Sequence, residues 1–276
     1  MRILQKDELQ TAEEVLLKHL PKSLQLYGLV YAYNKNEPNP VQFIVDTWPD
    51  FKVFICRPDT EKKQDFTRKV AIFSMDEKIL KKMLSDEDAI NWSAYFRLGG
   101  CDVSHTSTLR EVLLNRKVNY HWVASTNVLY LPDSCHLVTP TFDSKLKSRI
   151  SSLNLSHIDL INRTWTFGGS EHTYKNLTFL ISNLPSCCVI DDQGQPVSWI
   201  LVYECAALGI LYTLPEHRHK GYAKALIYTM AQRRLAEGYP VFCYIVEDNT
   251  VSYKIFKSLG FIEDPSYKTS SFEINI

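Results

Sequence analysis

A predicted strand, a basic loop and a predicted helix follow one another between residues 206 and 237, and this succession constrains the fold more than any other segment. The strand covers residues 206–214, and the loop PEHRHKG carries Arg218 and ends at Gly221. A helix N-terminus offers unpaired N–H groups and the positive end of the helix dipole, and glycine lets the backbone approach a ligand closely. The segment therefore predicts an anion-binding site, with a pyrophosphate as the implied ligand.

The elements on either side of this loop follow a regular βββαβαβ pattern. Residues 187–204 contain two apolar runs joined by a glycine-containing turn and predict a hairpin. After the helix, residues 241–246 predict a strand, and Asn249 is placed to cap a further helix. The second half of the chain is therefore predicted to be an α/β (α+β) domain.

The first half of the chain also mixes the periodicities of helices and strands. Its predicted elements are helices at 7–20, 76–90 and 106–115, two or three strands between 27 and 55, and a strand at 121–131.

A break in periodicity separates the two halves. Residues 132–148 contain two prolines and no regular apolar spacing, which predicts a linker. We therefore expect an N-terminal domain at 1–131 and a C-terminal domain at 149–276. Because both show short strands between helices, we expect the first to be a degenerate relative of the second.

Composition excludes several classes of protein. Lys+Arg and Asp+Glu are balanced at 31 each, whereas general nucleic-acid and membrane-surface binders carry a basic excess. The amino-terminal segment has no long apolar core, so we expect neither a signal peptide nor a membrane span. The seven cysteines form no CxxC pair and no cluster of zinc-binding spacing, so we expect reduced thiols and no metal site.

Two motifs resemble those of the GNAT acyltransferases. LPEHRHKGYA at 214–223 is similar to their acyl-CoA-binding loop, and SLGF at 258–261 is similar to the end of their second motif. DTWPDF at 46–51, LINRTW at 160–165 and FGGSE at 167–171 extend the resemblance over almost the whole chain, to the glycine N-acyltransferase family. The resemblance implies a GNAT fold, with splayed strands in a mixed central sheet, preceded by a smaller α/β N-terminal domain.

The resemblance also implies the reaction and its partners. The chain would transfer an acyl group from acyl-CoA to the amine of glycine, with glutamine as a second acceptor. Acyl-CoA would be a co-substrate, with no permanently bound cofactor, and the family places the protein in mitochondria, with the cytoplasm as the alternative. The motifs carry over as contacts of acyl-CoA onto Leu211, Thr213, Leu214, Arg218, His219, Lys220, Gly221, Tyr222, Ala223 and Asn249.

The acid–base positions depart from the family pattern. The family's proposed glutamate base falls on Ala207, and the general-acid tyrosine of many GNAT enzymes falls on Phe256. Glu204 and Tyr253 are the candidate replacements, although strand alternation would place residues 204 and 207 on opposite faces. Catalysis by water and backbone alone, and a slow or inactive protein, are the other hypotheses.

Two further functions stay open at this point. GNAT chemistry also serves acetyltransferases that act on protein lysines or N-terminal amines, and turnover of peptides without turnover of free amino acids would select this function. The residues at Ala207 and Phe256 are also compatible with a catalytically weak CoA-binding protein.

Overall fold

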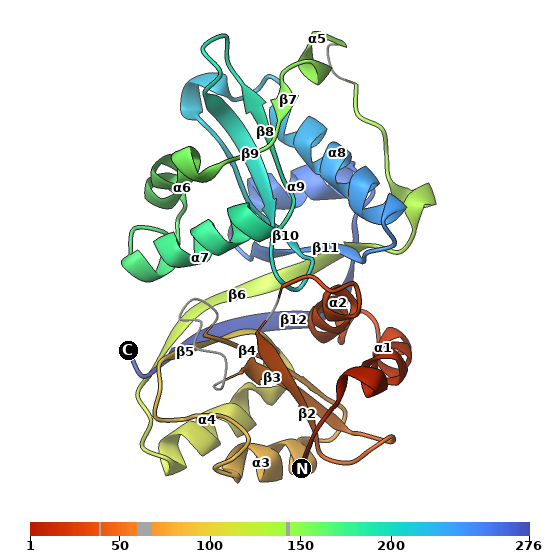
Figure 1. Cartoon of the computed structure of the whole chain (residues 1–276), viewed down its shortest axis with the longest axis vertical. Coiled ribbons are helices and arrows are strands. Elements are labelled where there is room, and N and C mark those ends of the chain that lie inside the picture. The colour runs from red at the N-terminus through yellow and green to blue at the C-terminus, as the bar shows by residue number, and fades with distance from the viewer. Residues whose placement is uncertain (39, 60–67, 142–143) are drawn as a thin grey trace. The chain divides into compact units, whose positions relative to one another are not determined.

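The chain divides into two compact units (Figure 1). Unit 1 comprises Met1–Val128 and Asp264–Ile276, and unit 2 comprises Leu129–Glu263. The structure is a computed structural model, and the residues that it describes are 1–38, 40–59, 68–141 and 144–276.

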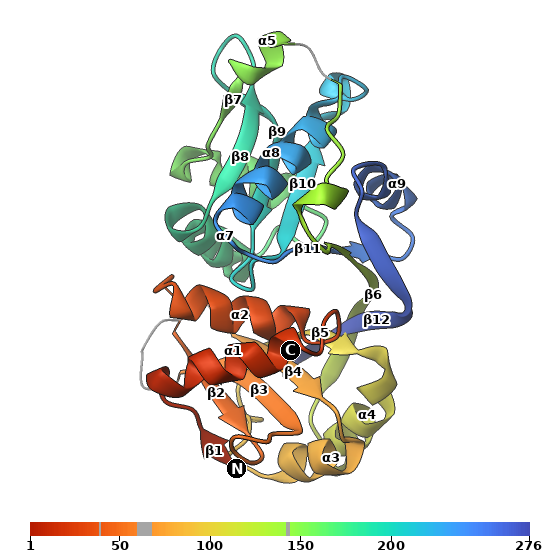
Figure 2. The same ribbon diagram turned by 90° about the vertical axis from the view of Figure 1, so that its right-hand side faces the viewer.

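Unit 1 is a mixed sheet covered by helices on both faces (Figure 2). Its strand order is β1-β2-β3-β4-β5-β12-β6, in which β4 and β5 run parallel. Ile44, Ile55 and Ile72 face the core under α3 and α4. Their neighbours point to the other face, where Tyr33 of α2 meets Phe43 at 5.6 Å between ring centroids. The elements are β1 (Arg2–Ile3), α1 (Leu9–Leu17), α2 (Leu24–Asn34), β2 (Val41–Val45), β3 (Val53–Pro58), β4 (Lys69–Ser74), α3 (Glu77–Ser85), β5 (Phe96–Asp102), α4 (Thr106–Asn115), β6 (Tyr120–Leu131) and β12 (Ile262–Ile274).

Among its described residues, unit 2 contains five strands in the order β11-β10-β9-β8-β7. Here β10 and β11 run parallel, and the other neighbouring pairs are antiparallel. Leu226 and Met230 of α8 and Phe256 of α9 belong to the core of this unit, and α7 packs against β9. The elements are α5 (Ser144–Lys147), β7 (Ile150–Ser151), α6 (Ile158–Thr164), α7 (Glu171–Asn183), β8 (Ser186–Ile190), β9 (Pro196–Val202), β10 (Leu208–Thr213), α8 (Tyr222–Ala236), β11 (Val241–Val246) and α9 (Thr250–Ser258).

The two halves of the chain repeat one succession of elements. The order β1-α1-α2-β2-β3-β4-α3-β5-α4-β6 corresponds, element by element, to β7-α6-α7-β8-β9-β10-α8-β11-α9-β12. The parallel pair falls at the same place in each succession, β4 with β5 and β10 with β11. The two halves of the chain therefore share one topology, and the degenerate kinship of the first half to the second stays a prediction.

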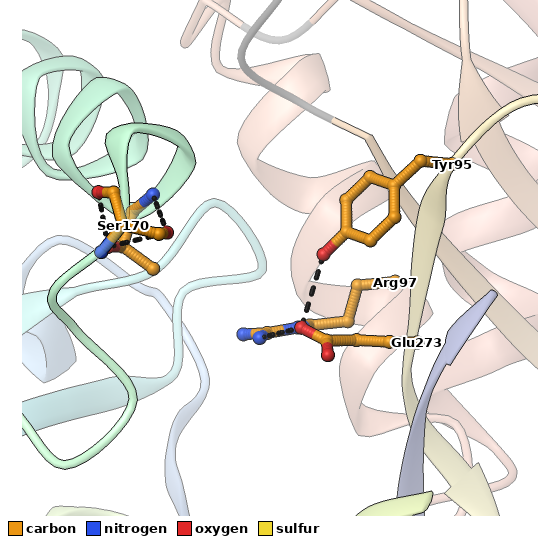
Figure 3. Close-up of polar contacts among 5 residues, drawn as sticks. Tyr95, Arg97, Ser170 and Glu273 are labelled. Atoms are coloured by element: carbon orange, nitrogen blue, oxygen red, sulfur yellow. Dashed lines mark hydrogen bonds and ion pairs between the residues drawn. The ribbon is translucent and has the colours of Figure 1, made fainter. Parts of the chain in front are cut away.

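The C-terminal strand corrects the predicted domain boundaries. We expected residues 149–276 to form one domain, but β12 pairs antiparallel with β5, so residues 264–276 belong to unit 1. Figure 3 shows the polar side of this pairing, where the Arg97 guanidinium binds the Glu273 carboxylate and the Tyr95 hydroxyl donates to the same carboxylate at 3.1 Å. Pairing between distant strands leaves no local signal in the sequence.

The predicted linker at 132–148 is also corrected, since its described residues, 132–141 and 144–148, belong to unit 2, and residues 142–143 lie outside the described part of the chain. Leu146 is buried in the core of that unit, and the Val138 amide donates to the Leu259 carbonyl at 3.0 Å. The two prolines interrupt the apolar periodicity of residues 132–148, although the described part of this segment packs within unit 2.

One predicted strand is a helix. Residues 27–34, YGLVYAYN, belong to α2, which packs against α1, β3 and β4. Tyrosine and valine favour strands, but burial on several sides of α2 outweighs that preference. The predicted helix at 76–90 is shorter, because α3 ends at Ser85. The predicted helix at 106–115 and strand at 241–246 are confirmed as α4 and β11.

Candidate functional site

The predicted anion-binding loop lies between β10 and α8. A short 3-10 turn, Pro215–His217, leads into Arg218, and Gly221 is the N-cap of α8 with φ 77°. Gly221 has no side chain that could accept a hydrogen bond from the first amides of α8. Arg218, His219 and Lys220 are exposed beside it. The loop therefore combines uncapped helix amides with two positive side chains, as an anion site requires.

The strands β10 and β11 separate beyond one point. Their parallel ladder has the single register pair Leu208↔Cys243, although both strands continue for several residues past it. The backbone of β10 after Leu208 therefore has no β11 partner in these strands, which the structure describes in full. This gap is the splay that the family resemblance implied.

A β-bulge lies in the same part of β10. The ladder with β9 pairs Gly209 with Leu201 and Tyr212 with Trp199, so β10 has one residue more than β9 between these pairs. Ile210 has φ 53°, which is uncommon for a β-branched residue. Such a bulge turns backbone N–H groups out of the ladder, where they can bind a ligand.

Gly209 is required by close packing next to this bulge. A Cβ atom at that position would lie 2.1 Å from the Tyr203 ring.

The Arg218 side chain contacts β10, the strand that precedes the loop. Its Nε donates to the Thr213 carbonyl at 3.2 Å, and its guanidinium lies 5.7 Å from the centroid of the Tyr212 ring. Tyr212 in turn stacks on the buried Trp199 at 5.4 Å between centroids. Stacking and one hydrogen bond orient the Arg218 guanidinium. The side chain is exposed, so its Nη groups are accessible to a ligand.

Several residues predicted to contact acyl-CoA have structural partners. The Leu214 amide donates to the Val197 carbonyl at 2.9 Å, so this N–H belongs to the fold and not to a ligand. The Thr213 hydroxyl lies 2.8 Å from that of Ser198. Asn249 caps α9 by accepting from the Ser252 amide at 3.1 Å, which confirms its predicted capping role. Leu211 and Ala223 are half-buried, and Tyr222 is buried as the first residue of α8.

Glu204 is not on a strand, which corrects its predicted placement. It lies in the turn between β9 and β10, which is closed by a hydrogen bond from the Tyr203 amide to the Ala207 carbonyl at 2.9 Å. Glu204 is buried, and Ala207 has no exposed surface. The turn therefore removes the strand alternation from which opposite faces were expected.

Tyr253 has a defined partner in unit 2. Its hydroxyl donates a short hydrogen bond to the Glu263 carboxylate, and this bond raises the pKa of the Tyr253 phenol. Phe256, at the family's tyrosine position, is buried and packs edge-on against Phe261 at 4.9 Å. The tyrosine hydroxyl of α9 is therefore one turn before the expected place, and no local pattern predicts its contact with Glu263.

A polar network lies at the start of α7, and Figure 3 shows the hydrogen bonds of Ser170 within it. The Asn162 side-chain oxygen accepts from the Gly169 amide at 3.0 Å and from the Thr173 hydroxyl at 2.8 Å. Ser170 and Thr173 cap each other's backbone amides at 3.1 Å. Sequence analysis did not identify Asn162 as a site residue, because its contact with α7 depends on the fold.

The described residues contain no group of three or more metal-binding side chains that could hold an ion. In the same part of the chain, no helix is both long enough and apolar enough to span a membrane.

Two family profiles together match almost the whole chain. The aralkyl acyl-CoA:amino acid N-acyltransferase profile matches residues 1–185, and the FR47-like protein profile matches residues 188–270.

Curated relatives and solved structures agree with these profiles. A glycine N-acyltransferase of Bos taurus is 31% identical over 280 residues, which cover 94% of each chain. The crystal structure of a Drosophila protein superposes with a TM-score of 0.80 at 18% identity, over 99% of this chain and 97% of that one. A tandem GNAT protein from the clavulanic acid biosynthesis pathway superposes with a TM-score of 0.51 at 10% identity, over 99% and 96% of the two chains. The predicted GNAT fold is confirmed.

Proposed function

The chain belongs to the glycine N-acyltransferase family of GNAT proteins, and we propose that glycine is the amine acceptor of its reaction. That reaction is transfer of an acyl group from acyl-CoA to the amine of an amino acid. Acceptor identity rests on the relatives, whose names specify glycine.

The acyl-CoA arm lies, in this proposal, in the gap between β10 and β11. The observation that carries it is the single ladder pair Leu208↔Cys243, which leaves the bulged part of β10 without a β11 neighbour. Pantetheine amides are able to take the place of the missing strand partner. The pyrophosphate then meets the uncapped amides of α8 next to Gly221, with Arg218 and Lys220 beside it.

Chemistry at this site follows from the balance of bonds and protons. A C–N bond forms, the C–S bond of the thioester breaks, and CoA leaves as a thiolate that takes up one proton. The glycine ammonium loses one proton before attack and a second during amide formation. In this proposal, backbone N–H groups at the bulge around Ile210 stabilise the oxyanion, which the register shift between Gly209 and Tyr212 supports.

We assign the first deprotonation to water, because Ala207 stands at the family's base position and is fully buried. Glu204 lies in the turn that contains Ala207 and not on β10. We propose that the thiolate is protonated by Tyr253, whose hydroxyl is hydrogen-bonded to Glu263. With water as the proton acceptor, the rate rises about tenfold per pH unit below the pKa of the glycine amine.

The test is acyl transfer by purified protein. Acetyl-, benzoyl- and oleoyl-CoA are each incubated with glycine or glutamine, and CoA release is followed together with product mass. The blank is the Arg218→Ala, Gly221→Asp double variant. An acylglycine that is absent from the blank supports the proposal. Acylation of a peptide library without turnover of free amino acids selects a protein acetyltransferase, and CoA binding without any product selects a CoA-binding protein.

We also propose that the protein resides in mitochondria, on the family resemblance alone. Imaging of the tagged full chain with a mitochondrial marker tests this, and diffuse cytoplasmic signal would contradict it.

A further inference from the structure

Arg149 joins the end of β8 to the first residue of α8. Its Nε donates to the Ile190 carbonyl at 2.8 Å, and the Ile190 amide donates to the Arg149 carbonyl at 3.0 Å. The backbone and the side chain of Arg149 are thus both hydrogen-bonded to Ile190, the last residue of β8. An arginine held in this way has little freedom to reorient.

The Arg149 guanidinium also contacts Tyr222. Its Nη1 donates to the Tyr222 hydroxyl at 3.0 Å, and the guanidinium carbon lies 5.6 Å from the centroid of the same ring. Tyr222 is 8% exposed and belongs to the core of unit 2. A hydrogen bond and a cation–π contact therefore fix the same side chain from one arginine.

Tyr222 is the residue through which the loop reaches the core. The four residues before it, 218–221, are all exposed, and Gly221 has no side chain with which to anchor the turn. The direction of the first α8 amides therefore depends on where the Tyr222 side chain is held. Binding of a phosphate to preorganised amides is tighter than to amides that must first be ordered.

We propose that Arg149 is a positioning residue for the phosphates of acyl-CoA, acting through Tyr222. It orients the first turn of α8 and adds a fixed positive charge at the positive end of the helix dipole. The inference rests on the proposed placement of the pyrophosphate at this loop. It gives the residue directly before β7 a role in substrate affinity that the loop motif does not reveal.

The experiment compares three variants with a matched control on the same helix. Arg149→Met removes the fork and the charge, Arg149→Lys keeps the charge, and Tyr222→Phe removes only the hydroxyl. Arg233→Met is the control, because Arg233 makes an exposed pair with Glu237 at 3.0 Å near the other end of α8. Calorimetric Kd for CoA, KM and kcat for acyl-CoA, and the thermal midpoint are measured for each full-length protein.

We expect Arg149→Met to raise Kd for CoA and KM for acyl-CoA about tenfold, with kcat changed less than about twofold. Arg149→Lys should recover part of the affinity, and Tyr222→Phe should add little when combined with Arg149→Met, since both break one contact. Unchanged Kd in folded Arg149→Met, or an equal loss in Arg233→Met, would overturn the inference. Should Arg149→Met fail to fold, Tyr222→Phe with unchanged Kd overturns it equally.

The binding measurement separates this inference from the proposed function. Wild-type protein that binds CoA but forms no acylglycine contradicts the function and leaves the Arg149 effect on Kd measurable. Acylglycine formation with an Arg149→Met Kd equal to wild type contradicts the inference and leaves the function standing.

Discussion

Asp76 and Gly221 occupy the same position in the two repeated units, the N-cap of the helix that follows the fourth strand. The Asp76 carboxylate accepts from the Lys78 and Ile79 amides at 2.9 and 3.0 Å. Gly221 has no side chain, so the equivalent amides of α8 receive no such bond. In unit 1 a carboxylate therefore takes the place at which an anionic ligand would bind, and a phosphate there would meet like charge.

One acyl-CoA is therefore expected to bind per chain. Gly221→Asp should weaken CoA binding about tenfold or more, because it places a carboxylate at the α8 amides. Asp76→Asn should leave the affinity and the stoichiometry unchanged. Titration calorimetry measures both quantities, and two CoA sites in wild-type protein would contradict the assignment.

The Tyr253–Glu263 contact predicts a pH dependence. The hydrogen bond to the Glu263 carboxylate raises the pKa of the Tyr253 phenol, so the folded protein holds this proton to higher pH than the unfolded chain does. The stabilisation is complete below the unfolded tyrosine pKa and is lost as pH rises through the folded one. Glu263→Gln should move the Tyr253 titration, followed by tyrosinate absorbance, to lower pH.

If Tyr253 protonates the thiolate, the alkaline limb of the kcat profile should move with that titration. Tyr253→Phe should remove the limb. A limb that stays in place in both variants would exclude Tyr253 as the acid.

Two neighbouring glycines should differ in how they tolerate alanine. A Cβ atom at Gly168 would lie 1.9 Å from the Asn162 carbonyl oxygen, whereas one at Gly169 would meet no atom within 4 Å. Gly168→Ala should lower the free energy of unfolding by about 1–3 kcal/mol through this clash. Gly169→Ala should lower it by about 1 kcal/mol, from its φ of 92° alone. Urea unfolding measures both, and the reverse order would contradict the packing argument.

Thiol reactivity should be confined to one residue. Burial raises the pKa of Cys187 to about 12 and that of Cys188 to about 11, and it also raises the pKa of Cys243. These thiols stay protonated near pH 8 and are poor nucleophiles. Cys135 is the exposed cysteine. Iodoacetamide should label it first in native protein, and Cys135→Ser should abolish the fast phase; rapid labelling of a second thiol would be inconsistent with the burial.

The elements that sequence analysis placed well are those whose signals are local. The hairpin of β8 and β9, the cap at Asn249 and the strand β11 each depend on residues within one turn or one strand. The failures involve distant partners. Residues 27–34 form a helix because α1 and the sheet bury them, and β12 lies in unit 1 because its partner is β5.

The candidate site also combines features that depend on local sequence with features that depend on distant contacts. The sequence by itself determined the loop from Arg218 to Ala223 and its glycine N-cap, because helix initiation and phosphate binding need those residue types at fixed spacing. Only the tertiary structure decided that β10 separates from β11 after Leu208, that Arg149 holds Tyr222, and that Glu204 lies in a turn. Each of these depends on contacts between segments far apart in the chain, and a contact of that kind follows from packing and not from local preference.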